Sequence, residues 1–299
     1  MMTVPELKAE VEHIIRQVRE LPSDTQQEAF HKLLNRLPVY ERELALQLIS
    51  ADVEFKPPPE HYVVLIHGIR THANWAEMVG GILATHAGAK PVPIKYGFFD
   101  LLKFLCPFRT RRAPVLRLLR ELRDLRTLHR DARISVVAHS FGTYALTQVL
   151  REPDIHLYRV IFSGCIIKDT FRRAYFAAQL APDDILNDCG MRDVLPILAK
   201  AVTWGYGATG TFGFGTVGVR DRYSEFGHSG CFQAEFVEKY WAPFIRDGTI
   251  IGTPSELTRK TPPYWASILS ILPLRWLIVA LAISAFFGVY WVLKRSLFA

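Results

Sequence analysis

Short apolar runs alternate along this chain with longer stretches whose apolar residues recur at a helical spacing. The runs are rich in β-branched residues, as is typical of strands that are buried on both faces of a sheet. They lie at residues 62–66, 92–96, 134–138 and 159–162, and residues 185–190 are predicted to form a further strand that runs into a turn. Because helical patterns separate most of these runs, the sequence predicts an α/β domain with a mostly parallel central sheet flanked by helices.

The N-terminal residues 1–55 show helical periodicity and no strand pattern. Residues 4–20 carry an apolar stripe, a capping box starts a second helix at Ser23, and residues 39–51 can form a third. No apolar signal segment precedes them. We interpret this region as a helical extension, which either packs on the main domain or docks a protein partner. The proline-rich residues 56–59 then form a stiff linker.

An uncharged apolar run, Trp276 to Leu293, lies near the C-terminal end. As a helix it would span about 27 Å, close to the thickness of a bilayer's apolar core. Trp276 and Trp291 lie near its two ends, as aromatic residues do at a membrane surface. We therefore expect a transmembrane helix at residues 274–295, joined to the main domain by a linker and juxtamembrane segment at 249–273.

The position of this run predicts a topology. Basic residues flank it on both sides, so charge alone does not orient it. With no signal sequence ahead of it, the simplest expectation is a tail-anchored protein with a single-pass C-terminal anchor and its main domain in the cytoplasm.

Composition adds a few limits. The 299 residues can hold one large α/β domain with extensions, and the net charge of +7 suits an anionic partner such as a membrane surface. The four cysteines show no CxxC or Cys/His zinc spacing, so we expect buried, reduced thiols and no metal site. They are Cys106, Cys165, Cys189 and Cys231.

Residues 133–143 join a predicted strand directly to a predicted helix through a turn that carries Ser140. This is the layout of a nucleophile elbow. The tight turn needs small residues two positions away on either side, and Ala138 and Gly142 meet that need, although Ala138 replaces the first glycine of the G-x-S-x-G pattern. A serine that merely caps the next helix would look the same locally. Ser140 is therefore a candidate nucleophile whose role depends on the rest of the chain.

A second loop of interest follows the run at 62–66, where the chain continues as His67, Gly68 and Ile69. A strand that ends in His-Gly resembles the oxyanion loop of α/β-hydrolases, in which a backbone N–H just after the glycine faces the developing negative charge. A strand that ends in His-Gly is weak evidence by itself, but it becomes much more specific when it lies about 70 residues before a strand-serine-helix turn. By position the donors would be Ile69 and, after the serine, Phe141.

Two loops beyond the elbow carry a candidate acid and a candidate base. Asp193 follows a strand that ends in glycine, a placement similar to the acid-bearing loop of the same fold; Asp188 and Asp169 are the alternatives. His228 lies on a loop between the last strand and the last helix, where a hydrolase base is expected. The order Ser140, Asp193, His228 is the order typical of α/β-hydrolases.

Residues 60–248 thus resemble an α/β-hydrolase of the lipase and esterase branch, over about 190 of the 299 residues. The resemblance implies that Ser140 is the nucleophile, His228 its base and Asp193 the acid that orients the base, with the two backbone donors named above. It implies acyl transfer to Ser140 and hydrolysis of the acyl-enzyme by water. It implies no metal and no organic cofactor.

Residues 97–130 are first aromatic and then basic, with nine arginines from Arg109 to Arg133. Apolar residues at a helical spacing make the basic part an amphipathic helix, which either covers the sheet with solvated arginines or lies on anionic headgroups. We expect no nucleic acid as partner, because no nucleic-acid-binding signature accompanies the charge. The glycine-rich segment 204–218 is not a phosphate loop and is expected to wall the pocket or to be purely structural.

Three functions remain open from the sequence. The first is a membrane-anchored serine esterase or lipase that cleaves acyl esters of lipids or of lipid-linked groups. The second is a serine hydrolase of another bond, such as a peptidase or thioesterase. The third is a non-catalytic hydrolase-fold module that recruits partners through its N-terminal helices; the intact Ser140, Asp193 and His228 disfavour it.

Overall fold

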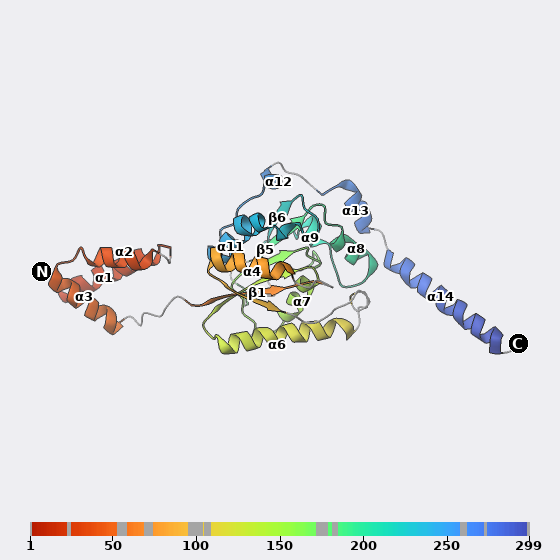
Figure 1. Cartoon of the computed structure of the whole chain (residues 1–299), viewed down its shortest axis with the longest axis horizontal. Helices are drawn as coiled ribbons and strands as arrows, with labels where there is room; N and C mark the ends of the chain where they lie inside the picture. Colours follow the sequence, from red (N-terminus) through yellow and green to blue (C-terminus); the bar gives the residue numbers. More distant parts are fainter. Residues whose placement is uncertain are drawn as a thin grey trace. The chain divides into compact units, whose positions relative to one another are not determined.

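The computed structural model describes residues 2–22, 25–52, 59–68, 74–94, 104, 109–171, 179–180, 185–257, 262–271 and 274–297. The chain divides into two compact units, Met1–Pro59 and Glu60–Ala299, which are described separately (Figure 1). The larger unit contains the sheet and every candidate site residue.

Three helices make up most of the described part of the N-terminal unit. They are α1 (Val4–Arg19), α2 (Gln26–Leu34) and α3 (Val39–Asp52). Their apolar faces enclose a small core that includes Leu7, Ile14, Leu34 and Ala45. A capping box holds the start of α1, where the Glu6 carboxylate accepts hydrogen bonds from the backbone N–H and the hydroxyl of Thr3. The capping box predicted at Ser23 lies outside the described residues.

Within the described residues, six strands form one sheet in the order β2-β1-β3-β4-β5-β6, and each of the five pairings is parallel. The strands are β1 (His61–Ile66), β2 (Lys90–Ile94), β3 (Arg133–His139), β4 (Val160–Ser163), β5 (Ile185–Gly190) and β6 (Arg220–Ser224). The predicted parallel sheet flanked by helices is therefore confirmed. Because all these strands run the same way, their carboxyl ends meet at one edge, where the chain leaves β1, β3, β4 and β5.

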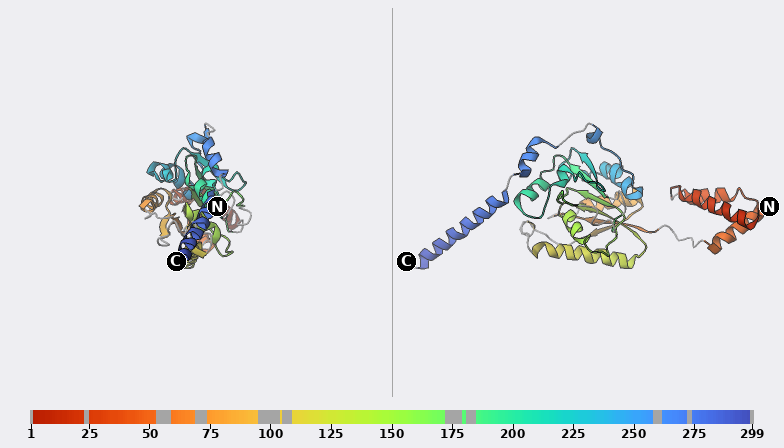
Figure 2. Two further views of the ribbon diagram at one scale, coloured as in Figure 1. Left: turned by 90° about the vertical axis from the view of Figure 1, so that its right-hand side faces the viewer. Right: turned by 180° about the vertical axis from the view of Figure 1, so that it is seen from behind.

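Helices cover both faces of this sheet (Figures 1 and 2). On one face lie α6 (Arg112–Leu128) and α7 (Phe141–Val149); on the other lie α4 (Asn74–Ala87) and α11 (Ala242–Asp247). Successive strand residues point to opposite faces, so Val64 and Ile66 join the core beneath α6 and α7, whereas Val63 and Leu65 join the core beneath α4 and α11. Both sides are covered, which explains why the central strands β1, β3 and β4 are largely apolar without alternation.

The described part of the larger unit also contains shorter elements. They are η1 (Arg109–Arg111), α8 (Leu195–Val202), α9 (Thr209–Phe212), η3 (Gly230–Phe232), α10 (Ala234–Phe236), η4 (Val237–Trp241) and α12 (Pro254–Leu257). The sequence predicts one continuous helix over residues 232–244. The structure instead has a 3₁₀ turn, a short α-helical turn and the π-helical turn η4 before α11 begins.

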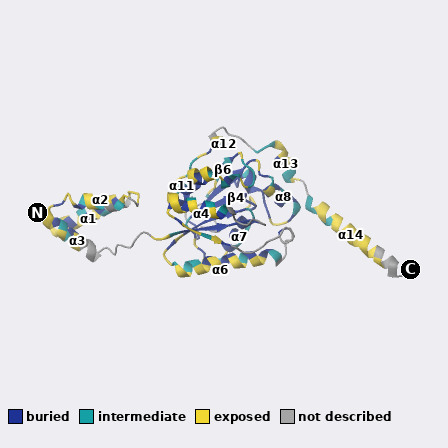
Figure 3. Cartoon of the chain, viewed as in Figure 1, coloured by how far each residue is buried: buried dark blue, intermediate teal, exposed yellow. Residues whose placement is uncertain are grey.

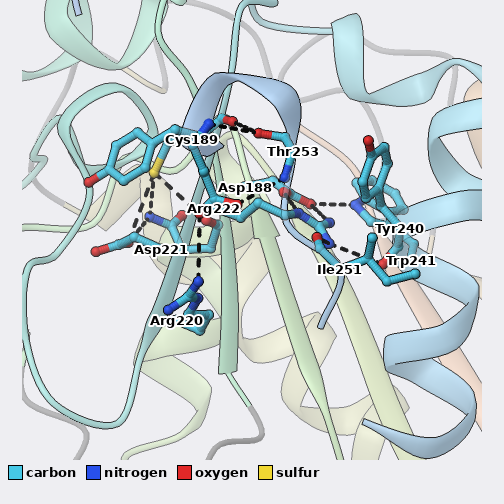
Figure 4. Close-up of polar contacts among 12 residues, drawn as sticks. Asp188, Cys189, Arg220, Asp221, Arg222, Tyr240, Trp241, Ile251 and Thr253 are labelled. Carbon is cyan, nitrogen blue, oxygen red and sulfur yellow. Dashed lines mark hydrogen bonds and ion pairs between the residues drawn. The ribbon is translucent and has the colours of Figure 1, made fainter. Parts of the chain in front are cut away.

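The apolar pattern does not predict β6, because its sequence is largely charged. Its Arg222 is fully buried and forms a bidentate ion pair with Asp188 of β5, with N–O distances of 2.6 and 2.8 Å (Figure 4). The indole N–H of Trp241 also donates to Asp188, and Arg222 donates to the Tyr240 carbonyl oxygen. A buried arginine needs such partners. A tertiary ion pair, rather than an apolar run, therefore specifies this edge strand.

Two apolar helices follow the sheet domain. Helix α13 (Tyr264–Ile271) packs on α8, with Ala266 and Ile197 in one cluster. Helix α14 (Leu274–Leu297) is long and apolar enough over Leu274–Trp291 to cross a membrane, and none of those residues is buried (Figure 3). A helix that is apolar on all sides and buried on none would be unusual in water.

Candidate functional site

Ser140 lies in the turn between β3 and α7, at the carboxyl edge of the sheet. Its backbone angles are φ 55° and ψ −122°, and it is the one non-glycine among the described residues with a positive φ. Such a conformation costs on the order of 1–3 kcal/mol and is tolerated where the surroundings hold it. One hydrogen bond that helps to stabilise this conformation runs from the Ser140 N–H to the carbonyl oxygen of Ser163 in β4, at 3.0 Å. The turn has the strained geometry of a nucleophile elbow.

Close packing around the turn explains the small residues there. A β-carbon on Gly142 would lie 2.8 Å from both the carbonyl oxygen and the Cγ2 of Ile66, so a side chain at that position would force α7 away from β1. A β-carbon on Gly68 would lie 2.7 Å from Ser140 Cβ and 3.1 Å from its Oγ. Ala138 is fully buried in the core. The spacing recognised in the sequence thus has a steric cause.

Asp193 and His228 form a hydrogen-bonded pair although 35 residues separate them in the chain. The Asp193 Oδ2 lies 2.8 Å from His228 Nδ1, while its other oxygen accepts the Leu195 N–H at 3.0 Å. The carboxylate side chain is 1% exposed and the imidazole 18% exposed. This arrangement fixes one ring nitrogen against a buried acid and leaves the other nitrogen, Nε2, to accept a proton.

The His228 ring lies over the loop that leaves β4, next to the elbow. A β-carbon on Gly164, whose φ is +52°, would lie 2.7 Å from His228 Cε1 and 2.9 Å from His139 Cε1. The Ser140 N–H is hydrogen-bonded to Ser163, the last residue of β4, so Ser140 and His228 lie against two adjacent residues, Ser163 and Gly164. Among the described residues, no hydrogen bond joins the Ser140 hydroxyl to His228. In hydrolases that bond is often long or poorly aligned until substrate is bound.

His139, which directly precedes Ser140, packs its ring against the ring of His228. Its ring centroid lies 4.5 Å from that of His228 and 4.8 Å from that of Phe232, and its Nδ1 lies 3.1 Å from the Ser163 hydroxyl. Burial, and secondly the neighbouring His228, hold the pKa of His139 well below its ordinary value. A neutral His139 thus supports the His228 ring without placing a second positive charge beside it. The sequence pattern does not identify this contact.

The two alternative acids are placed differently from Asp193. Asp188 lies inside the sheet, where Arg222 and Trp241 occupy its oxygens (Figure 4). Asp169 is exposed and lines a cavity beside α8. Of the three carboxylates, Asp193 is the one hydrogen-bonded to His228.

The two predicted oxyanion donors have different outcomes. Ile69 lies outside the described residues. Phe141 is the first residue of α7 and is fully buried, so its backbone lies directly after the Ser140 turn at a helix N-terminus. A backbone N–H at that position is where the fold is expected to present an oxyanion donor.

The basic segment ahead of β3 is mostly a sheet-covering helix. In α6, Leu118 and Leu122 are buried and Arg123 pairs with Glu152 and Asp154. Arg111 departs from the expected solvated face: it is 5% exposed and lies 4.0 Å from the centroid of the Tyr206 ring, with its donors on carbonyl and hydroxyl oxygens. It anchors the glycine-rich segment to the start of α6.

Within the described part of the chain, no group of three or more His, Cys, Asp or Glu side chains could hold a metal ion. Cys165, Cys189 and Cys231 are free and buried, and burial raises the pKa of each thiol, to about 12 for Cys165. These thiols are therefore protonated and unreactive at neutral pH.

Searches for known relatives yield structural matches alone: no protein-family profile and no curated protein matches the sequence. One similar structure is a protein of the α/β-hydrolase superfamily from Xanthomonas campestris pv. campestris, with 15% identity, a TM-score of 0.42, and coverage of 62% of this chain and 98% of the other. Another is an uncharacterized protein from Bacillus cereus, with 13% identity, a TM-score of 0.46 and 82% of each chain covered. Because both TM-scores are below 0.5 and both identities are low, the fold assignment rests on the chain's own parallel sheet and on the strained turn at Ser140.

Proposed function

We infer that this chain, which has the α/β-hydrolase fold, is a serine hydrolase in which Ser140 is the nucleophile, His228 the general base and Asp193 the orienting acid. One observation carries the inference: Ser140 occupies a strained turn beside a loop that also contacts His228. The Nδ1 of His228 is in turn hydrogen-bonded to the buried Asp193. A structural helix cap would need neither the positive φ nor the acid–base pair on the neighbouring loops.

In the first half of the reaction, Ser140 Oγ attacks the carbonyl carbon of an ester and its proton moves to His228 Nε2. Asp193 holds the imidazolium by its Nδ1–H and stabilises the positive charge. The oxyanion forms beside the N-terminus of α7, where the backbone N–H of Phe141 is the proposed donor. The carbon–oxygen bond of the ester then breaks, and the alcohol leaves with the proton from His228.

In the second half, a water molecule attacks the acyl-enzyme. His228 takes a proton from the water, the bond between the acyl carbon and Ser140 Oγ breaks, and the proton passes to the serine. The products are a carboxylic acid and the regenerated enzyme. No step requires a metal or an organic cofactor.

We propose acyl esters of membrane lipids, or of lipid-linked groups, as the substrates. The support comes from α14, which is apolar, long enough to span a bilayer and unburied along Leu274–Trp291. A single-pass anchor of this kind, with the sheet domain in the cytoplasm, would keep Ser140 close to a membrane. A membrane-bound substrate would then meet the active site without leaving the bilayer surface.

The test is covalent labelling of the full chain in a non-ionic detergent by a fluorophosphonate probe. Wild type should label, and Ser140→Ala and His228→Ala should not, whereas Ser267→Ala, which changes an exposed serine of α13, should label as wild type does. A folded wild type that takes no label, or a Ser140→Ala variant that labels fully, would contradict the proposal. The full chain is needed because α13 packs on α8.

The substrate class needs a separate measurement. Hydrolysis of ester, thioester and peptide substrates by the full chain in nanodiscs should be fastest for esters with long acyl chains. Faster turnover of a soluble peptide or thioester would replace the lipid-esterase proposal by that of a hydrolase acting on another bond.

A further inference from the structure

A cavity of about 280 Å³ lies beside the loop that follows β4, against α8 and the first turn of α14. Its walls come from Lys168 and Asp169, from Lys200 of α8, from residues 206–209 and 212–213, and from Arg275 of α14. The cavity is separate from the pair formed by Asp193 and His228. We refer to it as the basic pocket.

Three cations and one carboxylate line the basic pocket. Lys168, Lys200 and Arg275 form no ion pair with another of the described residues, although Arg275 lies over the ring of Trp204 at 6.0 Å. The Arg275 Nε is buried and has no hydrogen-bond partner in the described part of the chain. A buried guanidinium nitrogen without an acceptor is costly, and a bound anion would supply that acceptor.

The neutral donors of the basic pocket are already engaged. The Thr209 hydroxyl donates to the Ile167 carbonyl oxygen, and the Tyr206 hydroxyl donates to that of Phe104. The charged heads of the lysines and the arginine are therefore the groups left to bind a ligand. Ammonium groups together with a guanidinium fork are typical of phosphate recognition.

We propose that the basic pocket binds the phosphate of an anionic phospholipid headgroup. The proposal rests on the membrane placement of α14 in the proposed function, but not on the chemistry at Ser140. It adds a lipid-binding site outside the catalytic residues.

The position of the basic pocket favours a lipid over a soluble phosphate. Arg275 is the second residue of α14, so it lies where the apolar helix leaves the sheet domain. The next residue, Trp276, is 60% exposed and packs edge-on against Trp204 at 5.6 Å. Tryptophans and basic residues at the end of an apolar helix are typical of the headgroup layer.

The basic pocket also adjoins the catalytic loops. Thr211, between the pocket residues Thr209 and Gly213, donates its hydroxyl to the Asp193 carbonyl oxygen at 2.6 Å. Lys168 lies on the loop that leaves β4, four residues beyond the Gly164 that contacts His228. A headgroup held there would fix the orientation of the active-site edge against the membrane surface.

The test measures binding of short-chain lipids to the full chain in a non-ionic detergent, below their micellar concentrations, by isothermal titration calorimetry. The probes are dihexanoyl phosphatidic acid, dihexanoyl phosphatidylcholine, glycerol phosphate and inorganic phosphate. Phosphatidic acid should bind best, and the double variant Lys200→Gln/Arg275→Gln should weaken its binding about tenfold or more. The matched control is Arg112→Gln/Arg120→Gln, which removes the same charge from the exposed face of α6 and should bind as wild type does.

Each other outcome overturns part or all of the proposal. Equal weakening by the α6 control would show that general surface charge binds the lipid. Equal binding of inorganic phosphate and phosphatidic acid would assign the pocket to a soluble phosphate. No loss in the pocket variant would exclude the site. Fluorophosphonate labelling of the same variants separates the two proposals, because loss of lipid binding with intact labelling leaves the serine hydrolase standing.

Discussion

Gly68 and Ser140 approach each other so closely that a β-carbon on Gly68 would lie 2.7 Å from Ser140 Cβ. Gly68 lies two residues after the end of β1, and Ser140 begins the turn after the neighbouring β3. The contact therefore joins the proposed oxyanion loop to the proposed nucleophile, and the absence of a side chain at residue 68 sets the distance between them.

Replacing Gly68 by alanine should push these two loops apart. We expect Gly68→Ala to lower the rate of fluorophosphonate labelling by at least about tenfold, because misplacement of a reacting group by a fraction of an ångström raises the barrier. The matched control is Gly81→Ala in α4, where a β-carbon would meet nothing within 4 Å. It should keep wild-type labelling and raise the melting temperature slightly, since alanine favours a helix. Equal labelling of the two variants would contradict this prediction.

The strain at Ser140 predicts a trade between stability and activity. Glycine adopts a positive φ at little cost, so Ser140→Gly should melt about 2–4 °C above Ser140→Ala, with both variants inactive. Differential scanning calorimetry of the full chain measures this difference. At Ser267, inside α13, the order should be reversed, with the alanine variant melting above the glycine variant. The same order at both positions would argue against strain at the turn.

The two aspartates of the β5 region should respond in opposite ways. Asp193→Asn should lower the labelling rate by about 10³-fold or more while the protein stays folded, because the amide no longer stabilises a protonated His228. Asp188→Asn leaves Arg222 buried without its full counter-charge, and it should lower the melting temperature by about 10 °C.

Labelling rate and melting temperature, measured side by side on both variants, separate these roles. If Asp188→Asn retained its melting temperature and lost labelling, the acid would be Asp188 and the assignment of Asp193 would be wrong.

Acid should destabilise the fold through His61. Burial first, then Arg159 and Arg133, lower the pKa of His61 to about 4, below the ordinary value of 6.5. Between these two pH values the unfolded chain binds a proton that the folded chain does not. The contribution of His61 to the free energy of unfolding is therefore fully present above pH 6.5 and is lost as the pH falls towards 4. The loss from this residue is at most about 3 kcal/mol.

Urea unfolding at several pH values between 7.5 and 4 measures this effect. His61→Gln, which cannot titrate but can still bond the Ser135 hydroxyl, should show a shallower fall in the free energy of unfolding than wild type. Burial also lowers the pKa values of His67 and His139, so these residues contribute to the acid-induced fall in the free energy of unfolding in both proteins. Parallel curves for the two proteins would contradict the prediction.

Patterns local to the chain identified much of the fold. Local patterns predicted five of the six strands in the described part of the chain. Four came from apolar runs, because strands covered on both faces need apolar sequence, and β5 came from a short segment that leads into a glycine turn. The serine turn was visible as well, since its small neighbours lie within two residues of it. The strand β6 was missed because Arg222 replaces an apolar run by an ion pair with Asp188, a partner on another strand. The sequence predicted a continuous helix over residues 232–244 and did not predict its breaks, for a similar reason. The π-helical turn there ends at Trp241, whose indole N–H donates to the same Asp188 carboxylate.

The sequence by itself determined the order of the elements, the candidate residues Ser140, Asp193 and His228, and the apolar C-terminal helix, because periodicity and motif spacing are local properties of the chain. The tertiary structure alone decided which carboxylate meets His228, since three aspartates fit the local pattern and pairing depends on distances across the fold. It also decided the contact of His139 with His228 and the gathering of Lys168, Lys200 and Arg275 around one cavity. Residues far apart in sequence meet there because parallel strands bring their carboxyl ends, and the loops that follow them, to one edge.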